Sequence, residues 1–388
     1  MVKVRNTGSN KSPKTGPIPE PITVSTTTGP TNTGPENIEA IKGRGSSEQP
    51  KNRYSTRHSQ PVDDGWGTAP ERTAPPTRLF PDRTITLITR NQSPDIGFDR
   101  SINPYKGCEH GCIYCFARPT HAYLDLSPGL DFETKIFYKT NVRERRAAEL
   151  ANPNYRCATI AMGTNTDPYQ PAEKRNRITR AILEILLEAR HPVSLVTKSR
   201  LVLRDLDLLA ELARFELVSV AMSVTTLHNA LKTKLEPRTA NGAARLRVIR
   251  ELRAANVPAS VMVAPVIPFI NDSEIEDIVA AAADSGALSA NYILLRLPLE
   301  VKELFHNWLL QHYPLKAGRV MNAIRSTRGG RAYDPTWGKR MRGEGNIAEL
   351  IGARFHAAVK RHNLHNAAVP ELRTDLFRPP GDRQLRLI

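Results

Sequence analysis

Three of the chain's four cysteines lie within eight residues, in the segment Cys-Glu-His-Gly-Cys-Ile-Tyr-Cys. Cys108, Cys112 and Cys115 follow the spacing C-x3-C-x2-C, and only Cys157 lies elsewhere. Thiolates this close on one loop can converge on one metal centre, and a soft multi-sulfur ligand set suits an iron–sulfur cluster or zinc. Ordinary ferredoxin-type clusters and structural zinc sites have four protein ligands, whereas three leave one position open. The segment therefore predicts a metal centre that can coordinate and activate a small molecule.

Two other arrangements of these cysteines have to be weighed. Zinc bound by the three clustered cysteines, with His110 or His121 as a fourth ligand, is the main alternative to an iron–sulfur cluster. A disulfide framework fits less well, because a chain of 388 residues has only four cysteines and no apolar signal segment follows its polar N-terminus. Cys157 opens an expected strand, which predicts a small buried side chain rather than a catalytic thiol.

The cysteine segment, with Tyr114 directly before the third cysteine, resembles the cluster loop of the radical S-adenosylmethionine (SAM) enzymes. The wider segment 103–118, Asn-Pro-Tyr-Lys-Gly-Cys-Glu-His-Gly-Cys-Ile-Tyr-Cys-Phe-Ala-Arg, most resembles the branch related to spore photoproduct lyase, which is often described as DNA-repair photolyase-like. The resemblance extends from about Thr84 to about Leu364. It implies that the three cysteines bind a [4Fe–4S] cluster and that SAM chelates the fourth iron. It also implies one-electron reduction by a reductase such as flavodoxin or ferredoxin, which yields a 5′-deoxyadenosyl radical.

From Ser101 onward, short β-branched runs alternate with helical patterns. Strands are expected at 101–105, 158–162, 193–197, 217–224, 259–266 and 291–297, and helices at 173–190, 204–214, 240–255, 272–283 and 299–310. Apolar strands separated by helices predict an α/β fold with a parallel sheet covered on its outer side. Six such units fit a partial (β/α)6 TIM-like barrel, the fold that the resemblance to radical SAM enzymes also implies. The cysteine loop follows the first strand and should therefore lie at the mouth, where barrel active sites form.

The turn after the second expected strand supplies the first candidate contacts with SAM. It contains Gly163, Thr164, Asn165, Thr166 and Asp167. Glycine and asparagine permit a sharp turn, and the threonines offer short hydrogen-bonding groups. Radical SAM enzymes usually have a Gly-Gly-Glu-like segment there, which receives the cofactor ammonium. This chain departs from that segment, so any of residues 164–167 is a candidate for this role, and an ordinary Asx or ST turn is the alternative.

Further candidate contacts lie at the ends of the next two strands. Lys198 ends the third strand, where its charge can neutralise the SAM carboxylate, and Ser223 lies in the fourth, where its hydroxyl can hydrogen bond that carboxylate. The lyase-like branch has a lysine and a serine at matching positions in this role, and Tyr114 is a further candidate beside the cofactor. Arg238 and Arg296 are candidates for contact with an anionic substrate or for structural ion pairs.

The resemblance to spore photoproduct lyase ends at the hydrogen-atom donor. That enzyme uses a cysteine just after the second strand, assisted by tyrosines beside the third cluster cysteine. This chain has no thiol in residues 164–167, and Phe116, which follows Cys115, has no hydroxyl. The residues therefore favour radical initiation but not repair of a thymine dimer, and no catalytic hydrogen-atom donor is identified.

Composition divides the chain into three parts. Residues 1–79 contain eleven of the thirty prolines and many Gly, Ser, Thr and Asn residues, so they are expected to form a disordered tail. The barrel core is expected at 80–315 and a basic C-terminal extension at 316–388. No apolar stretch has the length of about 20 residues that a membrane span needs. The small number of cysteines and an oxygen-sensitive cluster indicate the reducing cytoplasm.

Charge favours an anionic substrate. The chain has 55 Lys and Arg against 39 Asp and Glu, a formal net charge of +16, and residues 316–388 hold fifteen Lys and Arg against six Asp and Glu. DNA or RNA is therefore a candidate partner. In segment 325–345, arginines are interleaved with Tyr333 and Trp337. This pattern predicts a clasp on a phosphate backbone or a loop that caps the barrel, and an ordinary solvated surface is the alternative. A closing helix is expected at 347–360.

Three functional hypotheses follow from these patterns. The preferred one is a cytoplasmic radical SAM enzyme that acts on nucleic acid or a nucleotide. A radical SAM enzyme with a protein or small-metabolite substrate is the second. The third is a non-catalytic zinc or iron–sulfur module that binds nucleic acid.

Overall fold

The computed structural model describes residues 40–55, 75–364 and 369–380, which belong to one compact unit, Ile38–Ile388. Most of the expected N-terminal tail, residues 1–39 and 56–74, lies outside the described residues. Residues 40–55 pack against the core, because Ser46 is 1% exposed and its N–H donates to Glu133 at 2.9 Å. The folded unit therefore includes part of the segment expected to be a tail.

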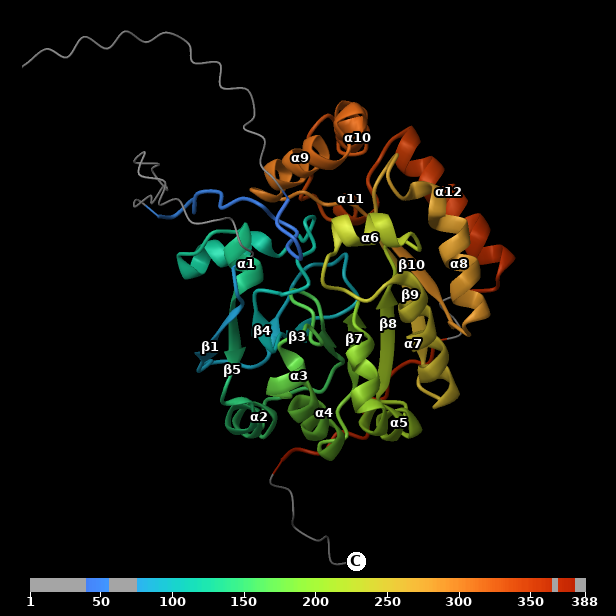
Figure 1. Ribbon diagram of the computed structural model, residues 1–388. Coiled ribbons are helices and arrows are strands. Elements are labelled where there is room, and N and C mark those ends of the chain that lie inside the picture. The colour runs from blue at the N-terminus through green and yellow to red at the C-terminus, as the bar shows by residue number, and fades with distance from the viewer. Residues whose placement is uncertain (1–39, 56–74, 365–368, 381–388) are drawn as a thin grey trace, which may run out of the picture. The chain divides into compact units, whose positions relative to one another are not determined.

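The main sheet has seven strands in the order β10-β9-β8-β7-β6-β3-β2 (Figure 1). Its strands are β2 (Thr89–Arg90), β3 (Arg100–Ile102), β6 (Ile160–Met162), β7 (Val193–Thr197), β8 (Val218–Ser223), β9 (Ala259–Val266) and β10 (Ala290–Leu294). The six strands from β3 to β10 pair in parallel in chain order, and β2 pairs antiparallel with β3 at the edge. This arrangement confirms the α/β fold and the six-stranded partial barrel of the radical SAM type.

A second sheet of three strands was not expected from the sequence. It has the order β1-β5-β4 and consists of β1 (Arg78–Asp82), β4 (Tyr105–Lys106) and β5 (Lys135–Lys139). The strand expected at 101–105 is split between the two sheets, because β3 ends at Ile102 and Tyr105 begins β4. Pro104 lies at this break, where a residue without an N–H group cannot continue a ladder of hydrogen bonds.

Helices connect the parallel strands, and α7 and α8 lie beside β8 and β9 (Figure 1). The α-helices are α1 (Leu130–Thr134), α2 (Val142–Leu150), α3 (Glu173–Asn176), α4 (Ile178–Glu188), α5 (Leu206–Arg214), α6 (Asn229–Leu235), α7 (Gly242–Ala254), α8 (Ile275–Asp284), α9 (Val301–His312), α10 (Pro314–Ser326), α11 (Lys339–Arg342) and α12 (Asn346–Arg361). The 3-10 helices are η1 (Arg118–Leu124), η2 (Arg200–Asp205) and η3 (Asp272–Glu274). Within the described ranges, no helix is both long and apolar enough to cross a membrane.

The observed helices differ from the expected ones at several places, and α1, α2, α6, α10 and α11 were not expected. The helix expected at 173–190 is broken at Arg177, whose φ of 51° is left-handed, so α3 and α4 are separate. Helix α6 was missed because Asn229–Leu235 is short and polar. The closing helix expected at 347–360 is present as α12 and packs against α8, while α10 begins before the expected boundary at residue 316. The C-terminal residues through α12 thus continue the layers of the barrel.

Candidate active site

The three clustered cysteines lie on the loop between β4 and η1, at the end of the sheet where the parallel strands finish. Cys108 and Cys112 are buried, and Cys115 is half-buried. Backbone contacts hold the loop in place: Cys108 N–H donates to Phe132 O at 2.9 Å, and Ile113 N–H donates to Leu235 O at 3.1 Å. Backbone hydrogen bonds to two distant parts of the chain therefore fix where the thiols lie.

A buried ion pair also contacts the cysteine loop. The guanidinium of Arg118 pairs with Glu133, and both side chains are fully buried. Arg118 Nε also donates to Cys112 O at 3.0 Å, while Glu133 accepts from the N–H groups of Gly45 and Ser46 at 3.0 and 2.9 Å. Every lone pair that Glu133 presents to this interior thus meets a donor, which is the condition under which a buried ion pair holds its geometry.

The three thiols lie close to one another in a buried environment. Burial raises the pKa of all three thiols, and for Cys108 the nearby Asp167, Cys112 and Cys115 raise it further. Their mutual influence shows that the three sulfurs lie near one another. Metal binding requires thiolates, so cationic iron has to offset the cost of burial.

The histidines considered as zinc ligands have other partners. His110 lies 3.3 Å from the Asp167 carboxylate, and His121 Nε2 lies 3.0 Å from Lys135 O. In the part of the chain that the structure describes, no three Cys, His, Asp or Glu side chains are arranged to hold a single metal ion. Each of these two histidines therefore has one ring nitrogen in contact with a protein group, and the three cysteines remain the predicted cluster ligands.

Lys198 lies at the centre of the site and contacts the predicted Ser223. Its Nζ donates to Ser223 Oγ at 2.8 Å and to Thr225 Oγ1 at 2.9 Å, and it lies 3.0 Å from a carboxylate oxygen of Glu236. The same ammonium lies 5.7 Å from the centre of the Tyr114 ring. Three predicted cofactor contacts, from β7, β8 and the cysteine loop, are thus brought together.

Sequence reasoning missed the carboxylate that organises this group. Glu236 is fully buried and hydrogen bonds or pairs with Tyr114, Lys198, Arg245 and Thr225, the last at 2.6 Å. Burial raises its pKa, but the charges of Arg245 and Lys198 and these hydrogen bonds outweigh burial and hold the pKa well below its usual range. Glu236 stays ionised and fixes both cations. It follows the unexpected helix α6, so its position was not visible in the β/α alternation.

The turn after β6 is shaped by a glycine and anchored by an aspartate. Gly163 has a φ of +87°, and a Cβ there would lie 2.0 Å from Val196 O, so only glycine permits this close approach. Asp167 accepts from Thr197 Oγ1 at 2.7 Å and from Lys198 N–H at 2.8 Å. Burial raises the pKa of Asp167, but His110 and these donors lower it more, and the net pKa is below its usual value.

The polar groups of this turn therefore have different surroundings. Asp167 is occupied by protein donors, and Thr166 Oγ1 donates to Tyr105 O at 2.9 Å. Thr164 and Asn165 are half-buried. The last two remain the predicted contacts for the cofactor ammonium, while Asp167 orients the neighbouring strand end that carries Lys198.

The other sequence candidates lie at the edges of the site. Arg238 pairs with Glu109 at 3.3 Å. Arg296 lies over the ring of Phe116, at 4.7 Å from its centre. Cys157 is half-buried three residues before β6 begins, at the far end of that strand, and burial raises its thiol pKa to about 11. Cys157 was expected to open this strand, but it lies outside β6. It also lies at the opposite end of the strand from the cysteine loop.

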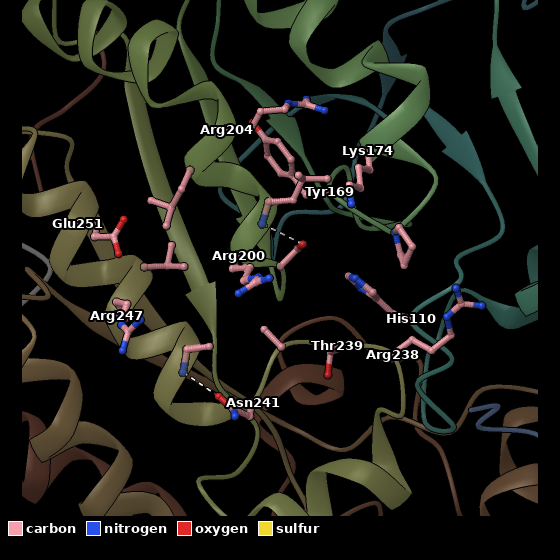
Figure 2. Close-up of a pocket in the computed structure, with 17 residues that line it drawn as sticks. His110, Tyr169, Lys174, Arg200, Arg204, Arg238, Thr239, Asn241, Arg247 and Glu251 are labelled. Carbon is pink, nitrogen blue, oxygen red and sulfur yellow. Dashed lines mark hydrogen bonds between the residues drawn. The ribbon is translucent and has the colours of Figure 1, made fainter. Parts of the chain in front are cut away.

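A basic cavity of about 680 Å³ lies beside the cysteine loop (Figure 2). His110 and Arg238 border it on one side, and Arg247 and Glu251 on α7 border it opposite. Further lining residues are Lys174, Arg200 and Arg204. Neither the cysteines nor Lys198 line this cavity, so it adjoins the cofactor site without being part of it.

The fold is similar to solved structures of spore photoproduct lyase. The lyase complexed with dinucleoside spore photoproduct has a TM-score of 0.54 and 15% sequence identity, and the match covers 73% of this chain and 79% of that chain. A lyase variant with bound AdoMet and dinucleoside spore photoproduct gives the same values. At this identity the likeness shows a common fold.

Sequence comparison identifies the family. Residues 102–282 match the radical SAM superfamily. An uncharacterized protein of Mycobacterium tuberculosis is 38% identical over 276 residues, which cover 71% of this chain and 78% of that protein. An uncharacterized protein of Methanocaldococcus jannaschii is 27% identical over 213 residues, covering 55% of this chain and 76% of that protein. The chain belongs to the radical SAM superfamily, and this membership supports an enzymatic, SAM-dependent activity.

Proposed function

We propose that the chain is a radical SAM enzyme whose Cys108, Cys112 and Cys115 bind a [4Fe–4S] cluster and whose substrate is a nucleic acid or a nucleotide. The observation that carries this proposal is that the three clustered thiols and the Lys198–Ser223 pair lie together at the end of the parallel strands. When bound, the reduced cluster and SAM supply a 5′-deoxyadenosyl radical that abstracts hydrogen.

The chain's own residues would prepare the site for SAM. Lys198 presents an ammonium for the SAM carboxylate, and Ser223 adds a hydroxyl 2.8 Å from that ammonium. Glu236 and Arg245 hold Lys198 and Tyr114 in place from within the core. Because this network is buried, the interactions act at low dielectric and exclude water from the radical.

The preferred substrate class follows from charge and from the lyase fold. The cavity beside the cysteine loop is lined by five Lys and Arg side chains and one acid, Glu251, and the solved lyase of similar fold binds a dinucleoside. The chain lacks a thiol after β6, so the proposed reaction is not the lyase reaction. We expect that, after the radical abstracts a hydrogen atom from a nucleotide-containing substrate, the substrate radical reacts in a different way from that in the lyase. We expect the reaction to take place in the cytoplasm, with a flavodoxin- or ferredoxin-type reductase as the electron donor.

The decisive experiment is anaerobic cluster reconstitution, reduction with dithionite in the presence of SAM, and an assay for 5′-deoxyadenosine. The wild-type chain should form 5′-deoxyadenosine, and Cys108→Ala, Cys112→Ala and Cys115→Ala should each abolish it. Cys157→Ala is the matched control, because this cysteine lies at the far end of β6 and should leave the product unchanged.

The outcome also separates the other hypotheses. A brown protein that carries labile sulfide but forms no product would indicate a non-catalytic iron–sulfur module. One zinc per chain without iron would favour the zinc-binding module. Product formation that is stimulated by peptides or small metabolites but not by DNA, RNA or nucleotides would overturn the proposed substrate class and keep the radical mechanism.

A further inference from the structure

A group of arginines at the end of β10 is not used by the proposed mechanism. Arg296 follows the strand, Arg328 follows α10, and Arg342 ends α11. Arg328 donates to Leu295 O at 2.9 Å, and Arg342 lies 4.1 Å from the centre of the Tyr292 ring. The three side chains, from separate parts of the chain, therefore border the same short stretch from Tyr292 to Arg296.

These three arginines differ from the neighbouring cations in having no carboxylate partner among the described residues. The neighbouring cations have carboxylate partners, in the pairs Arg331–Asp334, Lys339–Glu344 and Arg340–Asp95. Among the described residues, no carboxylate forms an ion pair with any of the three arginines at β10. Only half of the basic residues in segment 325–345 are thus neutralised by local acids.

Each of the three arginines also has an unused hydrogen-bond donor. Arg296 Nε, Arg328 Nε and Arg342 Nη1 are buried and lack a hydrogen-bond partner within the described ranges. A buried donor without a partner costs about 1–3 kcal/mol. Three such donors in one region indicate that a partner is missing.

The partner has to be negatively charged. Burial lowers the pKa of Arg328 and the nearby charge of Arg296 lowers it further, while Asp334 opposes both. The two guanidinium groups are therefore close enough to repel each other, and Arg328 is only 1% exposed. An anion would satisfy the donors and offset this repulsion, and arginine's planar fork suits phosphate oxygens.

The arginines lie next to the cysteine loop. Arg296 stacks on Phe116, the residue after Cys115, and the ring of Phe116 is 42% exposed. Arg296 and Arg342 are half-buried, so the group reaches the surface along one edge. A ligand held there would lie beside the predicted site of radical formation.

We propose that Arg296, Arg328 and Arg342 form a binding site for a phosphate group of the substrate. The assignment of this phosphate to the substrate rests on the proposed function, whereas the affinity of the arginines for phosphate does not. The site takes one phosphate, either of a nucleotide or of a nucleic-acid backbone, and positions the attached group near Phe116.

The test compares the reconstituted full chain with Arg296→Gln and Arg328→Gln, using inorganic phosphate, a 5′-mononucleotide and a single-stranded oligonucleotide as calorimetric probes. Each substitution should weaken binding about tenfold, which is about 1.4 kcal/mol. The matched control is Arg250→Gln, an exposed arginine on α7, which should leave binding unchanged. Arg296 makes only long contacts, at 3.5 and 3.6 Å, so its variant keeps the test valid if Arg328→Gln fails to fold.

The arms of this test give separate answers. A greater loss with the oligonucleotide assigns a nucleic-acid phosphate, and a greater loss with the mononucleotide assigns a free nucleotide. Equal affinity of the wild type and the Arg296 variant for all probes would overturn the proposed site. Phosphate binding through these arginines in a chain that forms no 5′-deoxyadenosine would refute the radical function and leave the anion site standing.

Discussion

Two groups of cations near the cysteine loop differ in whether a carboxylate of the protein pairs with them. Lys198 and Arg245 share the fully buried carboxylate of Glu236. Arg296 and Arg328 have no such acid and leave their Nε donors unpaired within the described residues. The first group has a permanent carboxylate partner, although this one carboxylate leaves the two cations with a net charge of +1. The second group has no carboxylate partner and is complete only when an anion binds.

This difference separates positioning from recognition. A cation that has to hold a fixed geometry gains from a permanent carboxylate partner, because removing that partner would leave a buried charge. A cation that has to bind an exchanging ligand cannot be fully neutralised by the protein. The paired group therefore suits the proposed cofactor site, where one positive charge is left for the SAM carboxylate, and the unpaired group suits an anionic substrate that enters and leaves.

The largest expected effect is the loss of the shared carboxylate. Glu236→Gln leaves Lys198 and Arg245 without a counter-charge, so the free energy of unfolding should fall by about 3–5 kcal/mol. Denaturant titration measures this change, and Glu251→Gln, at an exposed glutamate on α7, is the control that should change stability little. If Glu236→Gln lowers the free energy of unfolding no more than Glu251→Gln does, the carboxylate partner does not distinguish the paired cations from the unpaired arginines.

The pH dependence of stability in the wild type and in Glu236→Gln gives a second test of this prediction. The folded pKa of Glu236 lies below its ordinary value of 4.5, so its ionised form stabilises the fold above that pH and the contribution is lost as pH falls below it. The stability gap between wild type and Glu236→Gln should therefore be largest near neutral pH and narrow in acid. A gap that widens in acid would contradict an ionised Glu236.

The second effect concerns cofactor binding. Lys198→Met removes the ammonium that Glu236 positions, and SAM affinity should fall about 10- to 100-fold, as for a lost charge-assisted hydrogen bond. Equilibrium binding of SAM to the reconstituted chain measures it. Lys198→Arg should not restore the affinity, because a planar fork does not replace a compact ammonium among Ser223, Thr225 and Glu236. Unchanged affinity in both variants would remove Lys198 from the cofactor site.

A smaller effect is expected at the rim of the basic cavity. Arg247 and Lys174 are exposed, and no described acid forms an ion pair with either. If this rim follows a phosphate backbone, Arg247→Gln should weaken oligonucleotide binding a few-fold and reduce the salt slope by about one. An unaltered salt slope would confine phosphate recognition to the arginines at β10.

The smallest effect is predicted for stability in the unpaired group. Arg296→Gln removes a cation–π contact and two long contacts, so the free energy of unfolding without phosphate should change by less than about 1 kcal/mol. A thermal or denaturant transition measures this. Destabilisation as large as that of Glu236→Gln would mean that Arg296 holds the fold rather than a ligand.

Local pattern predicted the order of the elements because each parallel strand is apolar and each helix has one apolar face. β7 and β9 were predicted with their observed bounds, and the cysteine spacing indicated the superfamily to which the chain belongs. Lys198 and Ser223 were expected at the same edge of the sheet, because neighbouring parallel strands end there, but their direct contact at 2.8 Å was not predicted. These features depend on spacing along the chain, which a sequence shows directly.

What the sequence did not reveal depends on distant partners. Glu236 follows a short polar helix, and nothing in its local sequence shows that Arg245 and Lys198 converge on it. Likewise, the formal charge of the C-terminal segment did not show that Arg340 is neutralised by Asp95 while Arg328 is not. Whether a charged side chain has an ion-pair partner depends on the fold. Composition alone therefore predicted only that the net charge is positive.

The contacts of segment 40–55 bear on how many residues the barrel needs in order to fold. At one end it donates two N–H groups to Glu133 beneath the cysteine loop. At the other, Arg53 pairs with Glu300 at 2.8 Å, and Glu48 accepts from Asn307 of α9 at 3.0 Å. It thus ties the first β/α unit to the last across the open side of the sheet. The inherited module, residues 102–282, is therefore smaller than the unit that folds, and a chain trimmed to it would lose this strap together with the final strand.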